Sequence, residues 1–165
     1  MSIDKCDSKL VVAESTGDLY LSSISLVEEV ECSEVKISDC GILMARIFKV
    51  PLSGDNCQYI VASACDDGFI VLTDFDSKTE LFKFRGLHTG GIRSLAVSVE
   101  NGDGSAVVSV ASFSYDQRCV VHKIAFPDIQ IVGCRKFDTS IFDGERVEFV
   151  NNSVVVLGSG MEMFI

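Results

Sequence analysis

Short runs in which apolar and polar residues alternate, divided by Gly, Asp and Asn, dominate the sequence. Alternation with a period of two is typical of β-strands with one buried face, because successive side chains point to opposite sides of a sheet. A helical spacing of apolar residues is hard to find. The pattern therefore predicts an all-β chain whose strands are joined by tight turns.

Four predicted hairpins share one pattern: an apolar strand, a stretch of small residues, a turn that carries Gly or Asp, and an alternating second strand. They lie near residues 10–24, 59–75, 107–126 and 154–165. When the turns are aligned, the same point of the second strand is occupied by Ser22, Thr73, His122 and Ile165, at intervals of 51, 49 and 43 residues. A period of about 40–50 residues is typical of a four-stranded propeller blade.

Two further strands are expected after each of the first three hairpins, at residues 25–32 and 41–52, 79–85 and 92–99, and 129–137 and 147–150. We interpret residues 1–165 as one domain, a partial β-propeller of about three to three and a half four-stranded antiparallel blades. We expect no innermost strand before Leu10 and an end within a third strand at Ile165. The remaining blades of a longer protein would then be a partner of this arc.

Two segments resemble the WD-repeat β-propeller family. Residues 66–74 (DDGFIVLTD) resemble the turn and third strand of a WD repeat, with Thr73 at the tryptophan position. Residues 86–96 (GLHTGGIRSLA) resemble the family's glycine–histidine loop, and residues 112–118 (SFSYDQR) resemble the following hairpin, with His122 at the next tryptophan position. The chain has no Trp, so the hallmark dipeptide is missing, whereas the period and the turn chemistry remain.

His88, Ser112, Ser114 and Asp116 include the residue types of a Ser-His-Asp triad. A nucleophilic serine requires a strained turn and an oxyanion hole, and no G-x-S-x-G elbow is present. The family resemblance implies a buried structural network instead, in which the loop histidine bridges a strand serine and a turn aspartate. We assign the repeat-related residues Asp67, Thr73 and His122 to the same network, with His122 as a satisfied core or interface histidine. No catalytic residue is assigned.

Met161, Met163 and Ile165 alternate along the last predicted strand and are expected in the core. The seven cysteines include no C-x-x-C pair, and with only two histidines they show no zinc-site spacing. Free thiols are typical of a reducing compartment, so we expect a cytoplasmic protein. No signal peptide or bilayer-length apolar run is present, and no membrane partner is expected.

Asp and Glu number 24 against 14 Lys and Arg, which makes the net charge −10. Binding to the phosphate backbone requires a surplus of basic residues, so we expect no direct nucleic-acid binding by this chain alone. No phosphate loop or dinucleotide fingerprint is present, and we expect no cofactor. We interpret the chain as a non-enzymatic scaffold that binds protein partners, through surfaces such as residues 75–85 and 101–105.

A narrower resemblance suggests a partner. Residues 112–118, the loop of His88 and the tail 138–164 resemble the C-terminal blades of the non-catalytic WD-repeat subunits of tRNA wobble-position 2′-O-methyltransferases. This resemblance implies an adaptor for the methyltransferase catalytic subunit. Two alternatives stay open: a general interaction module of another cytosolic or nuclear complex, and an enzyme on a propeller-like sheet, which the lack of any nucleophile, metal or cofactor signature disfavours.

Overall fold

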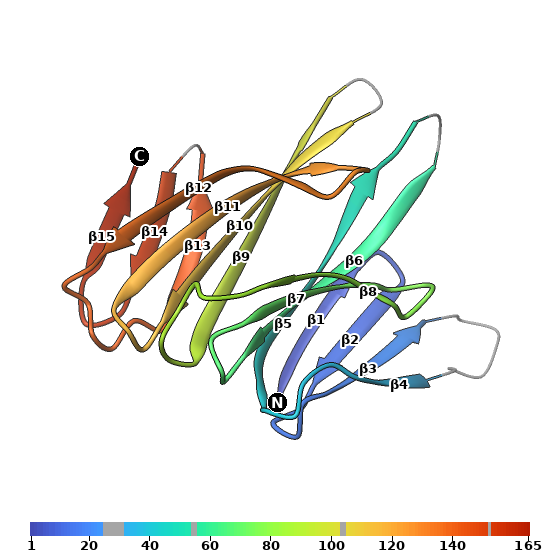
Figure 1. Ribbon diagram of the computed structural model, residues 1–165, viewed down its shortest axis with the longest axis horizontal. Coiled ribbons are helices and arrows are strands. Elements are labelled where there is room, and N and C mark those ends of the chain that lie inside the picture. Colours follow the sequence, from blue (N-terminus) through green and yellow to red (C-terminus); the bar gives the residue numbers. More distant parts are fainter. Residues whose placement is uncertain (25–31, 54–55, 103–104, 152) are drawn as a thin grey trace.

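A computed structural model describes residues 1–24, 32–53, 56–102, 105–151 and 153–165. The described residues form fifteen β-strands and no helix, which confirms the predicted all-β class. The strands form four antiparallel sheets, in which neighbouring strands follow one another in the sequence. We call these sheets blades 1 to 4; Figure 1 shows them side by side along the chain, from blue to red.

The first three blades have four strands each and the fourth has three. Blade 1 consists of β1 (Ser2–Cys6), β2 (Lys9–Ala13), β3 (Asp18–Ser23) and β4 (Cys32–Lys36). Blade 2 consists of β5 (Ile42–Pro51), β6 (Cys57–Cys65), β7 (Ile70–Asp74) and β8 (Glu80–Phe84). Blade 3 consists of β9 (Ile92–Asn101), β10 (Ala106–Ser114), β11 (Arg118–Phe126) and β12 (Gln130–Asp138). Blade 4 consists of β13 (Arg146–Val150), β14 (Ser153–Leu157) and β15 (Met161–Phe164).

The expectation that blade 1 lacks an innermost strand is wrong. β1 pairs with β2 from Ser2↔Ala13 to Cys6↔Lys9 and completes a four-stranded sheet. The polar residues of β1 do not give the apolar alternation from which the other strands were predicted. Asp4 contacts blade 2 through a hydrogen bond instead, because its Oδ2 accepts the backbone N–H of Ile47 at 2.9 Å. The fourth strand begins only at Cys32, and the predicted strand 25–32 falls almost entirely outside the described residues.

The core lies between the blades. Val11 and Leu19 of blade 1 pack in one cluster with Val61 and Val71 of blade 2. On the opposite face of blade 2, Ile60 and Leu72 join Leu95, Val108 and Phe126 of blade 3. Ala111 and Phe113 of blade 3 meet Val147, Val154 and Val156 of blade 4. The central strands β6, β7 and β10 are therefore covered on both faces, and they read as nearly continuous runs of apolar and small residues rather than as simple alternation.

Each of the first three hairpins turns through a residue in the left-handed region. Gly17 has φ of 93°, Gly68 has φ of 80°, and Gln117 has φ of 61° at the matching point of blade 3. A side chain disfavours this conformation by crowding the following carbonyl, so glycine suits the first two turns. The predicted tight turns therefore follow from local backbone chemistry.

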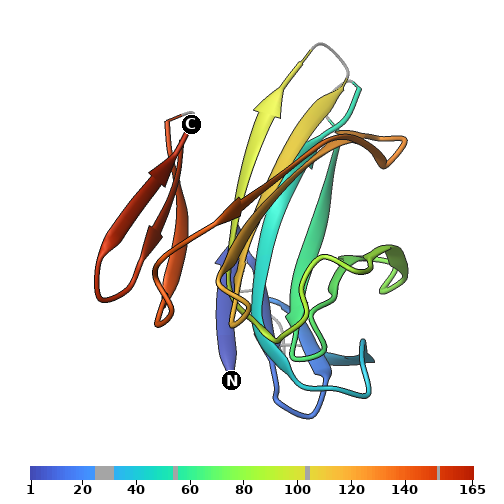
Figure 2. The same cartoon turned by 60° about the vertical axis from the view of Figure 1, so that its left-hand side comes forward.

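The prediction that Met161, Met163 and Ile165 belong to the core is wrong. Their exposed fractions are 66%, 52% and 86%. Phe164 points to the other face of the strand, where its ring stacks on Phe137 with centroids 4.6 Å apart. Figure 2 shows β13–β15 as a separate red sheet at one end of the arc. The methionine face is exposed because, within the described residues, no sheet packs on it.

Candidate functional site

A buried hydrogen-bond network joins two segments of blade 3. His88 lies in the loop that leads into β9, Ser112 is on β10, and Asp116 is in the turn between β10 and β11. Nδ1 of His88 lies 3.1 Å from Oδ1 of Asp116, and Nε2 lies 2.9 Å from Oγ of Ser112. The imidazole has no exposed surface, so the network lies beneath the hairpin rather than in a cleft.

The turn closes around the carboxylate of Asp116. Its Oδ2 accepts the backbone N–H of Thr89 at 3.0 Å, and its Oδ1 accepts the N–H of Arg118 at 3.1 Å. Burial alone would raise the pKa of Asp116, but the hydrogen bonds from Thr89 and His88 outweigh burial and hold the pKa below its usual value. Asp116 is therefore a carboxylate that can only accept, which places the imidazole proton on Nδ1.

Ser114 ties the same hairpin to the loop of His88. Its Oγ donates to the backbone carbonyl of Gly90 at 2.9 Å and accepts the N–H of Asp116 at 3.3 Å. The structure thus brings together four of the residues assigned to the network from sequence: His88, Ser112, Ser114 and Asp116.

The connectivity Asp116–His88–Ser112 is that of a serine-hydrolase triad, but the surroundings differ. Ser112 is 0% exposed, and its Oγ also lies 3.3 Å from the carbonyl of Val120. Burial lowers the pKa of His88 despite the opposing effect of Asp116. A substrate carbonyl cannot reach a hydroxyl with no exposed surface. The geometry instead suits a role in holding the loop against the turn.

Asp67 acts within its own turn, where its Oδ1 accepts the N–H of Phe69 at 3.2 Å. Ser38 lies in the loop before blade 2, and its backbone carbonyl lies beneath Gly17 in the turn of blade 1. His88 lies in the loop before blade 3, and its backbone carbonyl lies in the same way beneath Gly68 in the turn of blade 2. Ser38 is therefore to blade 2 what His88 is to blade 3. The hydroxyl of Ser38 accepts the N–H of Cys40 at 3.1 Å. Because serine is much shorter than histidine, the repeat around Asp67 has no equivalent of the His88 bridge.

Thr73 and His122 do not join the network. Thr73 Oγ1 and His122 Nδ1 are buried without a hydrogen-bond partner in the structure, as are Ser22 Oγ and Ser63 Oγ. The interpretation of His122 as a satisfied histidine is therefore wrong. The sequence resemblance places both residues at the tryptophan position of a WD repeat, and both side chains are shorter than tryptophan. Burial lowers the pKa of His122 to about 4, so its imidazole is neutral at pH 7.

An exposed aromatic group lies directly above this network. Tyr115, next to Asp116 in the turn, is 57% exposed, and the guanidinium of Arg93 lies 4.8 Å from the centre of its ring. Phe142, in the loop between β12 and β13, is 67% exposed. Hydrogen bonds from Ser159, aided by the charge of Arg93, lower the pKa of Asp143 in the same loop. We call Arg93, Tyr115 and Phe142 the turn-face patch; no motif in the sequence singled it out.

The two surfaces that the sequence suggested for partner binding are less suitable than the turn-face patch. In segment 75–85, Phe75 is 5% exposed and Phe84 is 3% exposed, so both rings belong to the core. Part of the loop 101–105 lies outside the described residues. Among the described side chains, no group of three or more His, Cys, Asp or Glu is placed to hold a metal ion. The same part of the chain contains no helix with the length and apolar character needed to span a membrane.

Neither a family model nor a curated protein sequence matches the chain. Solved structures do match its fold. The computationally designed Ika4 protein is 14% identical at a TM-score of 0.63, over 99% of this chain and 88% of that one. The WD40 β-propeller domain of Doa1 is 16% identical at 0.61, over 96% of this chain and 47% of that one. A chain of the Mitotic Checkpoint Complex is 12% identical at 0.60, over 99% and 50%.

At these identities the matches show the fold alone. The chain has the fold of a partial WD40 propeller and spans about half the length of the Doa1 domain and of the Mitotic Checkpoint Complex chain. The predicted fold class is therefore confirmed.

Proposed function

We propose that the chain is a non-catalytic scaffold that binds protein partners through the turn-face patch. The observation that carries this proposal is the Arg93–Tyr115 pair, an exposed aromatic ring with a guanidinium 4.8 Å from its centre. Arg and aromatic residues are enriched at the centres of protein interfaces, where they supply much of the binding energy. The WD40 fold supports the same general role, because its members act mainly as interaction scaffolds.

In this proposal the buried network fixes the turn that presents Tyr115. Asp116 is held by Thr89, Arg118 and His88, so the turn that presents Tyr115 is fixed before a partner arrives. Fixing an interface residue in advance lowers the entropy cost of binding. We therefore assign His88 and Ser112 a structural role in partner binding and not a role in catalysis.

The test is an affinity purification with paired variants. The double variant Tyr115→Ala/Phe142→Ser removes the aromatic part of the patch. Val132→Ser is the matched control, because Val132 is 57% exposed on β12 and lies outside the patch. We expect proteins that are retained by wild type and control to be lost from the double variant. Equal retention by all three forms would reject the patch as the binding surface.

The identity of the partner rests on the sequence resemblance alone. We propose the catalytic subunit of a tRNA 2′-O-methyltransferase, with this chain as the adaptor and the tRNA contacts made by other parts of the complex. Co-expression should recover the two proteins together, and the full protein should raise methylation of the wobble nucleotide. Loss of association in co-expression leaves only the general scaffold role. The free cysteines support a cytoplasmic location, which fluorescence microscopy of the tagged protein can test.

We also propose that further propeller blades cover the two outer faces of the arc. Ile3 of blade 1 is 57% exposed, and Met161 and Met163 of blade 4 are 66% and 52% exposed. Such faces favour association, because burying apolar surface is favourable. Light scattering of the isolated chain should therefore show self-association. A monodisperse and stable monomer would contradict the proposal.

A further inference from the structure

The two outer faces of the arc are of opposite kinds. Inside the chain, blade 2 packs one face on blade 1 and the other on blade 3, and blade 3 packs likewise between blades 2 and 4. Blades 1 and 4 lie at the two ends of the arc in Figure 1. The outer face of blade 1 therefore corresponds to a face that packs on a preceding blade, and the outer face of blade 4 to a face that packs on a following blade.

Alternation along the strands defines the outer face of blade 1. Val11 packs on blade 2, so its neighbours Leu10 and Val12 point to the outer face. In the first strand, Ile3 pairs with Val12 and Lys5 pairs with Leu10, which places all four side chains on one face. Ile3 is 57% exposed, and Lys5 is exposed as well. This face thus combines apolar side chains with a cation.

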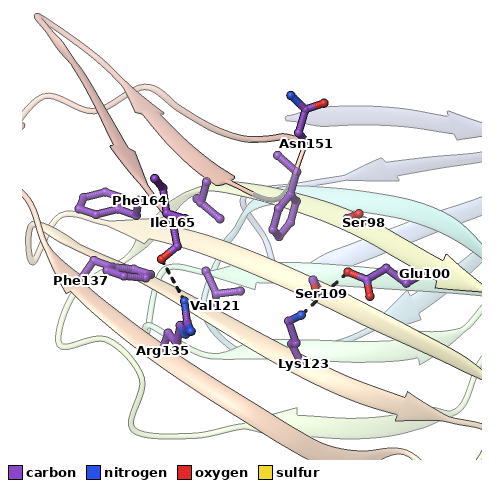
Figure 3. Close-up of a pocket in the computed structure, with 12 residues that line it drawn as sticks. Ser98, Glu100, Ser109, Val121, Lys123, Arg135, Phe137, Asn151, Phe164 and Ile165 are labelled. Carbon is purple, nitrogen blue, oxygen red and sulfur yellow. Dashed lines mark hydrogen bonds and ion pairs between the residues drawn. The ribbon is translucent and has the colours of Figure 1, made fainter.

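The last strand defines the outer face of blade 4. Figure 3 shows Phe164 facing Phe137 of blade 3, beside a cavity of about 570 Å³ between blades 3 and 4. The neighbouring Met163 therefore points away from blade 3, and it is 52% exposed. Met163 pairs with Val155, which pairs in turn with Glu148. This face thus combines apolar side chains with a carboxylate.

The two end blades also match each other in height. Their first strands β1 and β13 have five residues each, and each strand pairs with all five residues of the next. The residue after each first strand has a positive φ, of 52° at Asp7 and 55° at Asn151. In blades 2 and 3 the first strands have ten residues. The first hairpin of blade 4 is therefore the same size as that of blade 1.

Glu148 repeats a position that joins two blades inside the chain. Asp4 is the third of the five residues of β1, and its Oδ2 accepts the backbone N–H of Ile47 in blade 2 at 2.9 Å. Glu148 is the third of the five residues of β13. By the register of the hairpins, Lys5 holds the place in blade 1 that Ile47 holds in blade 2. A blade like blade 1 that packed on blade 4 would therefore bring its Lys5 to the carboxylate of Glu148.

The ion pair of Glu148 with Arg146 leaves room for this contact. Nε of Arg146 lies 2.8 Å and Nη2 lies 2.7 Å from the same oxygen, Oε1 of Glu148. A carboxylate has two oxygens and about four acceptor sites. Oε2 of Glu148 can therefore accept a further donor while the pair with Arg146 stays in place.

We propose that a second copy of this chain covers both outer faces, and that two copies close head to tail into a ring of eight blades. Blade 4 of each copy packs on blade 1 of the other, and Glu148 meets Lys5 in both contacts. A head-to-tail contact closes when the rotation between copies completes a circle. The arc matches 47% of the WD40 propeller domain of Doa1, so two arcs have about the extent of one propeller, and eight blades lie within the known range. This inference rests on the proposal that further blades cover the outer faces, and it names their source.

Sedimentation velocity of the full chain tests the number of copies. We expect monomers and dimers in equilibrium, and no species above twice the mass of one chain as the concentration rises, because closure uses both outer faces. Growth beyond the dimer would indicate an open head-to-tail filament and overturn the ring. A stable monomer would overturn both the ring and the proposal that the outer faces are covered.

Two variants, one on each outer face, test the head-to-tail order. Lys5→Glu alters blade 1 and Met163→Asp alters blade 4, and each should weaken the dimer by about tenfold, because each change enters both contacts of the ring. An equimolar mixture should recover dimers, since a mixed pair has one contact between two unaltered faces. If like faces paired instead, a chain with Lys5→Glu would still dimerise through blade 4. Undiminished dimers of the folded Lys5→Glu chain would therefore overturn the proposal.

A charge exchange tests the contact of Lys5 with Glu148. Glu148→Lys alone should weaken the dimer, and Lys5→Glu in the same chain should restore it, because opposite charges meet again. A double variant no stronger than Glu148→Lys alone would overturn the pairing of blade 4 with blade 1. Val132→Asp is the control for Met163→Asp, because Val132 is 57% exposed on β12 and lies on neither outer face. It should dimerise as wild type does, and circular dichroism confirms that each variant is folded.

The ring and the scaffold role fail separately. Self-association that neither Lys5→Glu nor Met163→Asp changes would reject the ring and leave the turn-face patch untouched. The affinity purification with Tyr115→Ala/Phe142→Ser still tests the patch, because Tyr115 lies in the turn between β10 and β11 of blade 3.

Discussion

His88 Nε2 lies 2.9 Å from the Oγ of Ser112, although the two residues are 24 positions apart. The contact joins the loop between two blades to the second strand of the next blade. Together with the 3.1 Å contact between Nδ1 and Asp116, it fixes both ends of one imidazole. The loop and the hairpin therefore act as one unit.

Replacing His88 by Ala should lower the free energy of unfolding by roughly 1–3 kcal/mol, because it removes the buried hydrogen bonds of the imidazole to Asp116 and Ser112. Urea denaturation followed by circular dichroism measures the change. Ser112→Ala removes one partner only and should cost less than His88→Ala. Equal stability of wild type and His88→Ala would contradict a structural role for the network.

Lys9 on β2 of blade 1 contacts two residues of blade 2. Its Nζ lies 2.6 Å from Oδ1 of Asp76 and 4.4 Å from the centre of the Phe75 ring. Lys9→Met keeps an apolar stem and removes the charge, and it should destabilise the chain by about 1 kcal/mol, since Asp76 is exposed and the cation–π contact adds little more. The loss should shrink in 1 M salt, because salt screens the ion pair. A loss that does not depend on salt would assign the effect of Lys9 to packing alone.

Two glycines with positive φ separate steric contact from backbone strain. A Cβ on Gly68 would lie 2.8 Å from the carbonyl oxygen of His88, whereas a Cβ on Gly86 would meet nothing within 4 Å. Gly86→Ala should cost about 1–2 kcal/mol from backbone strain alone. Gly68→Ala should cost more, because the loop that carries His88 must also move. Thermal melting of both variants tests this order, and equal melting temperatures would refute it.

Stability should fall with pH below about 6.5, the ordinary pKa of histidine. Burial lowers the pKa of His122 to about 4, so between these values the unfolded chain binds a proton that the folded chain does not. The loss should be about 1.4 kcal/mol per pH unit for this residue, and stability is complete above pH 6.5. The pKa of His88 is lowered by burial as well and adds to the slope in the same direction.

His122→Leu tests the origin of this slope. The variant cannot titrate at this position, so its unfolding free energy should depend less on pH between 6.5 and 4.5 than that of wild type. Urea titrations at several pH values measure both slopes. Identical slopes would show that other groups control the acid sensitivity.

Much of the fold could be predicted from the sequence because its signals are local. Strand alternation, the turns at Gly17 and Gly68 and the spacing of the repeats each depend on residues within a few positions of one another. The contacts of His88 with Ser112 and Asp116 were also within reach, because the repeat places all three around one hairpin. β1 escaped prediction because the polar Ser2 and Asp4 meet backbone groups of blade 2, which no local pattern records.

The local residue pattern therefore defines the strands and turns of each blade, whereas the packing of the blades against one another defines what each face of a blade contacts. Met163 and Phe164 are neighbours and equally apolar, yet Met163 is 52% exposed and Phe164 stacks on Phe137. His122 has the alternation of a core residue, but only the packed structure shows that its Nδ1 lacks a partner. The cavity of about 570 Å³ between blades 3 and 4 likewise appears only when blade 4 lies opposite Ser98 and Ser109. Burial depends on surfaces that come from distant parts of the chain, and the period of a strand cannot specify them.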